Sequence, residues 1–326
     1  MLFSLIHKNS PYIIFIYPVL FIVLFISHIL HPIEIPMYYD TNPMPLYAWI
    51  TQLHMYSKYI WYGVILLFML MNAFLLSRMQ ILFRIIDTAT AVPMLLYFLL
   101  SASSNVFQQC SPLHAALTFL LISIISIFKM YKNEQSLQPV FEAGFMLALA
   151  SMFYANMIFY AVFLYIALFV LVPFNWRQWI SLTIGILTPF IIVSSIYFLQ
   201  DQLYDFFELF IKNTFIWQKS FSFHYEHFIF FGFLALIFIF ALFHTFSGSI
   251  KKVATKKYYS LFFIFMLVTT GIFFLVPAAG KEIVFFLIIP LAFIIGNYLE
   301  NIRSRFWQEL IFTLIVIGVI LIQVFE

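Results

Sequence analysis

Long apolar runs alternate with short polar breaks along the whole chain. A helix that crosses about 30 Å of hydrocarbon takes roughly 20 apolar residues, and fewer where protein surrounds it. Eleven runs meet this requirement approximately, near residues 12–30, 59–77, 89–105, 113–130, 139–154, 157–174, 179–199, 228–246, 259–277, 282–297 and 308–325. The pattern predicts an all-α fold, a polytopic transmembrane helical bundle of about 11 spans that forms one domain over residues 1–326.

Two of the polar breaks, residues 32–58 and 200–227, are much longer than the others. Both carry apolar side chains at helical spacing, in the first break at Leu46, Trp49, Ile50, Leu53 and Tyr56. In the second break the apolar side chains alternate with acids, at Leu203, Phe206, Phe207, Phe210 and Ile211. One apolar face on a polar segment is typical of a helix that lies in the membrane interface. We therefore predict interfacial helices at 45–56 and 203–211.

The composition supports lipid as the main solvent of this chain. Hydrophobic residues make up 64% of it, charged residues 9%, and the mean hydropathy is +1.04. A soluble domain needs about a quarter of its residues charged. The single cysteine, Cys110, excludes an internal disulfide and a cysteine-cluster metal site. No run of Lys and Arg is long enough to indicate nucleic-acid binding.

The distribution of Lys and Arg predicts the orientation. With the N-terminus in the cytoplasm, twelve of the 16 basic residues fall in inner segments, and the outer ones are Lys58, Lys212, Lys219 and Lys281. The first apolar run has no small-residue cleavage site, so we expect a retained helix rather than a signal peptide. The C-terminus and both long breaks are then extracytoplasmic. The predicted location is a bacterial inner membrane, with multiple passes.

The outer segments hold the candidate functional residues. Asp40 is either a binding or catalytic carboxylate or a solvated side chain at an ordinary turn. Lys281 and Glu282 are either a charge pair at a helix start or, for Glu282, a group that faces a cavity. His224 and His227 flank Glu226, but two imidazoles alone do not make a metal site, so no cofactor is predicted.

The first half of the chain resembles the membrane core of GT-C-type glycosyltransferases. The likeness lies in an acidic first outer loop with an interfacial helix, carried by Tyr38-Tyr39-Asp40-Thr41-Asn42-Pro43-Met44-Pro45-Leu46. Residues 90–104, followed by Ser111-Pro112-Leu113-His114-Ala115-Ala116, resemble the third and fourth helices of such cores.

The resemblance implies an enzyme that uses polyprenyl-phosphate-linked sugars at the outer face, with Asp40 as general base or acceptor-orienting carboxylate. Since no arginine lies in an outer segment, Lys281 and Lys212 are the candidates for the phosphate, with His224 and Glu282 as further substrate contacts.

The chain also looks like an uncharacterised family of polytopic membrane proteins from Bacteroidota. This likeness lies in the opening run from Leu2 to Pro11 and in Phe141-Glu142-Ala143-Gly144-Phe145. It implies a location but no activity.

Three classes of function stay open. The first is the glycosyltransferase, whose partners are membrane lipid and a lipid-linked saccharide. The second is a non-catalytic subunit of a cell-envelope complex for secretion or assembly, bound to other envelope membrane proteins. The third is a transporter of a lipid or lipid-linked substrate. An enzyme needs an outer cavity beside Asp40, a subunit needs a flat apolar flank, and a transporter needs a polar groove across the bilayer.

Overall fold

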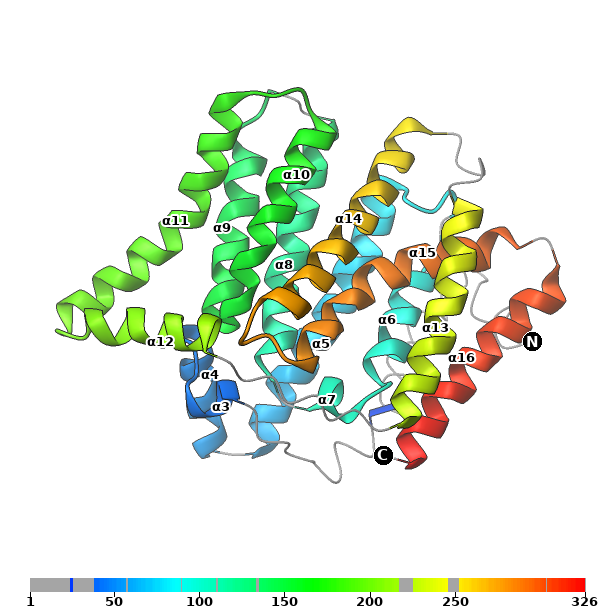
Figure 1. The fold of residues 1–326 in the computed structure, drawn as a ribbon, viewed down its shortest axis with the longest axis horizontal. Helices are drawn as coiled ribbons and strands as arrows, with labels where there is room; N and C mark the ends of the chain where they lie inside the picture. The colour runs from blue at the N-terminus through cyan, green and yellow to red at the C-terminus, as the bar shows by residue number, and fades with distance from the viewer. Residues whose placement is uncertain are drawn as a thin grey trace.

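The computed structural model describes residues 24–25, 38–56, 58–88, 90–109, 111–132, 135–216, 225–245, 252–302 and 304–325. Within these ranges every regular element is a helix and no residue belongs to a strand (Figure 1). This confirms the predicted all-α fold class. Of the first predicted span, near 12–30, only two residues belong to the described part, so that span is not tested.

The helices follow one another as a series of antiparallel passes with short elements at their ends (Figure 1). Their bounds are α3 Tyr38–Thr41, α4 Pro45–Tyr56, α5 Lys58–Phe83, α6 Val92–Ser101, α7 Asn105–Gln108, α8 Pro112–Phe128, η1 Lys129–Tyr131, α9 Gln138–Phe153, η2 Ala155–Tyr160, α10 Ala161–Leu171, α11 Trp176–Leu199, α12 Leu203–Phe215, α13 Tyr225–His244, α14 Val253–Leu275, η4 Lys281–Leu287, α15 Ile288–Asn301 and α16 Arg305–Phe325. The elements written η are 3₁₀-helices.

Six stretches of the described chain are long and apolar enough to cross a membrane. They are Tyr62–Phe83, Pro112–Tyr131, Trp176–Leu199, Val253–Leu275, Lys281–Asn301 and Arg305–Gln323. Four shorter apolar helices, Val92–Ser101, Gln138–Phe153, Ala155–Leu171 and Gly232–His244, lie where further spans were predicted. Helices of this length and hydropathy indicate a membrane protein. The number of eleven spans stays a prediction.

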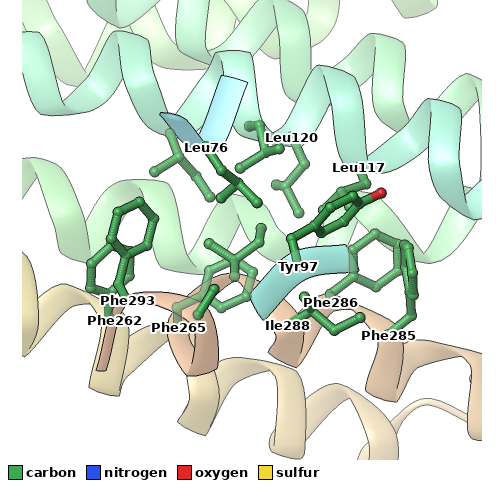
Figure 2. Close-up of a cluster of buried hydrophobic side chains, with 14 of the residues drawn as sticks. Leu76, Tyr97, Leu117, Leu120, Phe262, Phe265, Phe285, Phe286, Ile288 and Phe293 are labelled. Carbon is green, nitrogen blue, oxygen red and sulfur yellow. The ribbon is translucent and has the colours of Figure 1, made fainter. Parts of the chain in front are cut away.

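The centre of the bundle is a dense layer of aliphatic and aromatic side chains from six elements, α5, α6, α8, α14, η4 and α15 (Figure 2). Phe262 of α14 stacks on Phe293 of α15 with ring centroids 4.9 Å apart. Within an apolar window of 18 residues, 83% of the residues of Pro112–Tyr131 and 78% of those of Lys281–Asn301 are buried, against 22% in Trp176–Leu199. The first two therefore form the interior, and the last presents an apolar flank to its surroundings.

Helices α9 and α11 approach until their backbones touch. A Cβ atom added to Gly185 would collide with the carbonyl oxygen of Phe141, and one added to Gly144 would lie 2.5 Å from the carbonyl oxygen of Leu182. Small residues allow such close packing where lipid supplies no hydrophobic drive between helices. Gly144 belongs to the Phe141–Phe145 motif, so this packing gives a physical reason for part of that motif.

Interactions between distant segments define two ends of the bundle. At one, the basic end, Lys252 pairs with Asp87 at 2.7 Å, Lys132 donates to the Leu82 carbonyl, and Lys257 donates to the Leu171 carbonyl. These loops are the ones assigned to a common side by charge. At the other, the acidic end, lie α3, α4, α7, the α9–η2 junction, α12 and the start of η4 (Figure 1).

Candidate functional site

Five chain segments meet at the acidic end around a group of polar side chains, most of which are buried. They are α3, α4, the residues after α7, the junction of α9 with η2, and the first turn of η4. We call this group the tyrosine–carboxylate cluster, and its members are Tyr39, Asp40, Tyr47, Gln109, Tyr154, Asn156 and Glu282. Most of them are separated by tens of residues in sequence, so the cluster exists only in the folded chain.

Glu282 is the buried carboxylate of the cluster. Its side chain is 7% exposed, and its Oε1 accepts hydrogen bonds from the Tyr154 hydroxyl at 2.9 Å and from the Gly280 amide at 3.0 Å. The carboxyl group folds back so closely that a Cβ atom on Gly280 would collide with it. A side chain at position 280 would therefore displace the Glu282 carboxyl group from this arrangement. Lys281, half-buried, places a positive charge next to this carboxylate.

Tyr154 lies at the end of α9 and links Glu282 to a second amide. The Asn156 Nδ2 atom donates to the Tyr154 hydroxyl at 3.1 Å. The other side-chain atom of Asn156, Oδ1, is buried and has no hydrogen-bond partner among the described residues. Gln109 Oε1 is likewise buried and has no hydrogen-bond partner among the described residues. Buried polar atoms are normally paired with protein or water, so these two amide oxygens are left in need of such a partner.

Tyr39 stands between the two carboxylates. Its hydroxyl accepts a hydrogen bond from Gln109 Nε2 at 3.0 Å, and its ring makes edge contacts with Tyr47 and Tyr154 at 6.1 and 6.2 Å. Burial raises the pKa of Tyr39 well above its ordinary value, and the nearby charges of Glu282 and Asp40 raise it further. The phenol is therefore a neutral donor at physiological pH.

Asp40 is exposed, in contrast with its buried neighbour Tyr39. The hydroxyl of Tyr47, on α4, donates to Asp40 Oδ1 at 3.1 Å, so the carboxylate is held at the rim of the cluster. The sequence-predicted Asp40 and Glu282 thus lie at the same end, one at the surface and one inside. Tyr39 is near enough to both for their charges to act on its hydroxyl.

Helix α12 reaches the same rim. Asn213 donates to the Asn42 carbonyl at 3.0 Å and to the Met44 sulfur at 3.7 Å, which joins the second long break to the first. Lys212 of α12 is half-buried and pairs with Glu208 at 2.5 Å, so part of its charge is already neutralised. Lys281, unlike Lys212, directly adjoins the cluster. His224 lies outside the described residues.

The described residues bring no three His, Cys, Asp or Glu side chains into a metal-binding group. The chemistry available at the cluster is that of carboxylates, phenols and amides, with one lysine. The sequence did not predict four residues of the cluster as site residues, namely Tyr39, Tyr154, Gln109 and Asn156. Asn156 was the most accessible signal, because an amide between two apolar runs has to find a partner.

A protein-family model, a family of unknown function (DUF6427), matches residues 33–326 of the chain. The chain therefore belongs to this family. Neither a curated protein nor a solved structure matches it.

Proposed function

We propose that this chain is a membrane-embedded glycosyltransferase that works at its acidic end on a sugar carried by a polyprenyl phosphate. The observation that carries the proposal is the position of Asp40. It lies at the rim of a buried polar cluster, and the two long segments predicted to be interfacial meet there through Asn213 and the Asn42 carbonyl. The resemblance of residues 38–46 to GT-C-type enzymes supports the same assignment.

The reaction assigns a role to each group. The acceptor hydroxyl forms a bond to the anomeric carbon of the sugar, and the bond from that carbon to the phosphate oxygen breaks. Asp40, open to the aqueous side, takes the acceptor proton. The departing polyprenyl phosphate gains negative charge, which Lys281 stabilises. Tyr39 and the amides of Gln109 and Asn156 orient sugar hydroxyls by hydrogen bonding.

The membrane arrangement belongs to the proposal. Residues 12–30 and the ten later runs cross a bacterial inner membrane, with the basic end in the cytoplasm and the acidic end outside. Helices α4 and α12 lie along the outer interface, where an aqueous acceptor and a lipid-borne donor both have access. The strongly amphipathic face of α12 supports this placement.

The test is donor turnover by purified protein in lipid nanodiscs. The probe is an undecaprenyl-phosphate-linked hexose, and the measurement is release of undecaprenyl phosphate, by mass spectrometry, with an extract of the cell envelope as acceptor source. We expect wild-type turnover and a loss of about 100-fold or more in Asp40→Asn, since a positioned acid–base group contributes roughly 10²–10⁴-fold.

Asp201→Asn is the matched control. Asp201 is exposed at the same end, and its backbone φ of 56° is one that asparagine adopts readily. It should turn over donor like the wild type. Equal turnover by wild type and Asp40→Asn, or no turnover and no binding of undecaprenyl phosphate, would reject the proposal and leave the non-catalytic subunit as the better assignment.

A further inference from the structure

A separate pocket of about 430 Å³, lined by polar and apolar side chains, lies at the basic end, far along the bundle from the tyrosine–carboxylate cluster. It is formed by the last turns of α5, the loop that leads to α6, and the residue before α14. Its lining is Ser77, Gln80, Ile81, Arg84, Ile86, Asp87, Thr88, Thr90, Ala91 and Lys252. The pocket takes no part in the proposed reaction.

The loop that forms one wall is fixed by a buried side chain. Gln80, 3% exposed, donates to the carbonyls of Ile86 and Thr88 at 2.9 and 3.0 Å and accepts from the Ile86 amide at 3.0 Å. All three bonds run to backbone atoms of the loop. The pocket wall therefore has a defined shape rather than that of a loose surface loop.

Arg84 has an unfavourable backbone for an arginine. It follows the last residue of α5, and its amide bonds to the Gln80 carbonyl with φ at 46°, in the left-handed region. This position after a helix usually holds glycine, because a Cβ atom is strained there. A residue other than glycine in this conformation costs about 1–3 kcal/mol, so replacing Arg84 by glycine should relieve strain. Arg84 is one of the residues that line the pocket, so its charge is available to a ligand there.

The charges of the lining select an anion. Lys252 pairs with Asp87 at 2.7 Å, and Arg84 supplies a second cation with no second carboxylate in the wall. The pocket therefore carries one surplus positive charge, which matches the single negative charge of a phosphodiester. Hydroxyls of Ser77 and Thr88 add donors around it. An arginine fork fits phosphate oxygens in a bidentate manner.

An apolar stripe leads from the middle of α5 to this pocket. The side chains of Leu67, Phe74 and Ile81 are 60%, 62% and 72% exposed, and Ile81 is itself part of the wall. These positions are seven residues apart, so they share one face of the helix. A ligand with its phosphate in the pocket would place an acyl chain along this stripe.

We propose that the pocket binds the headgroup of an anionic phospholipid, with Arg84 as the main phosphate ligand. The negative phosphodiester pairs with the surplus positive charge, the hydroxyls of the pocket donate to its oxygens, and the acyl chains lie on the exposed face of α5. Basic pockets between membrane helices are typical sites for such headgroups. The site is independent of the proposed reaction.

The test compares lipid retention with stability in the purified full-length protein. The probes are phosphatidylglycerol, zwitterionic phosphatidylcholine and soluble glycerol 3-phosphate, each titrated in mild detergent and followed by native mass spectrometry and by the unfolding temperature. We expect wild type to bind phosphatidylglycerol at least about 10-fold more tightly than Arg84→Gly does. Arg84→Gly should unfold at the same or a higher temperature without lipid, because glycine relieves the backbone strain.

Arg177→Gln is the control, since Arg177 lies at the same end and packs over Trp176 outside this pocket. It should retain phosphatidylglycerol like the wild type. Equal retention by Arg84→Gly and wild type would overturn the site. If glycerol 3-phosphate binds as tightly as phosphatidylglycerol, the assignment of a lipid ligand is overturned and the ligand is a soluble phosphate.

Discussion

A carboxyl group inside a helical bundle needs hydrogen-bond donors, because the desolvation of its oxygens is otherwise uncompensated. Glu282 obtains them from Tyr154 and from the Gly280 amide. Tyr154→Phe removes the hydroxyl and keeps the ring, so it isolates this hydrogen bond. We expect the free energy of unfolding to fall by about 1–3 kcal/mol, the range for a hydrogen bond to a charged or buried group.

Tyr165→Phe is the control for that prediction. Its hydroxyl also pairs with a side chain, Thr183 at 2.8 Å, but the pair is exposed. Urea titration of the detergent-solubilised protein measures both variants, and for Tyr165→Phe we expect a change of about 0.5 kcal/mol or less. Equal losses for the two variants would show that Tyr154 is not a special support of Glu282.

Tyr39 makes the stability depend on alkaline pH. Its pKa is raised in the folded protein, so below the unfolded-state pKa of about 10 its contribution is fully present. As the pH rises beyond 10, the unfolded chain ionises and the folded chain does not, so stability falls by up to about 1.4 kcal/mol per pH unit. Tyr39→Phe should therefore lose less stability than wild type between pH 10 and 11.5. Parallel curves of unfolding free energy against pH would contradict this.

At the scale of helices, the close contact between α9 and α11 predicts that the same glycine-to-alanine change lowers stability there and raises it at an uncrowded position of another helix. Gly185→Ala places a Cβ atom against the Phe141 carbonyl, so the helices must separate. We expect a loss of about 1–3 kcal/mol, the usual cost of overpacking. Gly271, in α14, has nothing within 4 Å of an added Cβ atom, and Gly271→Ala should stabilise by about 0.5–1 kcal/mol through helix propensity. Thermal and denaturant unfolding of both variants measure this, and a loss in Gly271→Ala equal to that in Gly185→Ala would refute it.

The helices were predictable because a chain in lipid must satisfy its backbone internally and cover that backbone with apolar side chains. The helix predicted at 45–56 is α4, Pro45–Tyr56, and the one predicted at 203–211 lies within α12, Leu203–Phe215. Short 3₁₀ segments such as Lys281–Leu287 were not foreseen, since they depend on the neighbouring fold more than on hydropathy.

The site was predictable only in part, for a physical reason. Asp40 and Glu282 stood out because carboxylates are scarce in this chain. Tyr39 and Tyr154 did not, since 19 tyrosines occur and most such side chains fill the core or the interface. The Tyr154–Glu282 bond joins residues 128 positions apart, and no local pattern encodes such a pairing.

At the scale of the whole molecule, the two ends of the bundle differ in charge, and that difference predicts sidedness. Arg84, Lys132, Lys252 and Lys257 lie in segments that meet at the basic end. Basic residues near membrane helices stay in the cytoplasm. With Cys110 replaced by serine, a cysteine at Thr41 should react with a membrane-impermeant maleimide added to intact cells or spheroplasts, and one at Val253 should react only after lysis. A Ser220 cysteine, outside the described residues, should behave like the one at Thr41. Labelling of Val253 from outside, with Thr41 protected, would invert the orientation and place Asp40 in the cytoplasm, where an extracytoplasmic acceptor has no access to it.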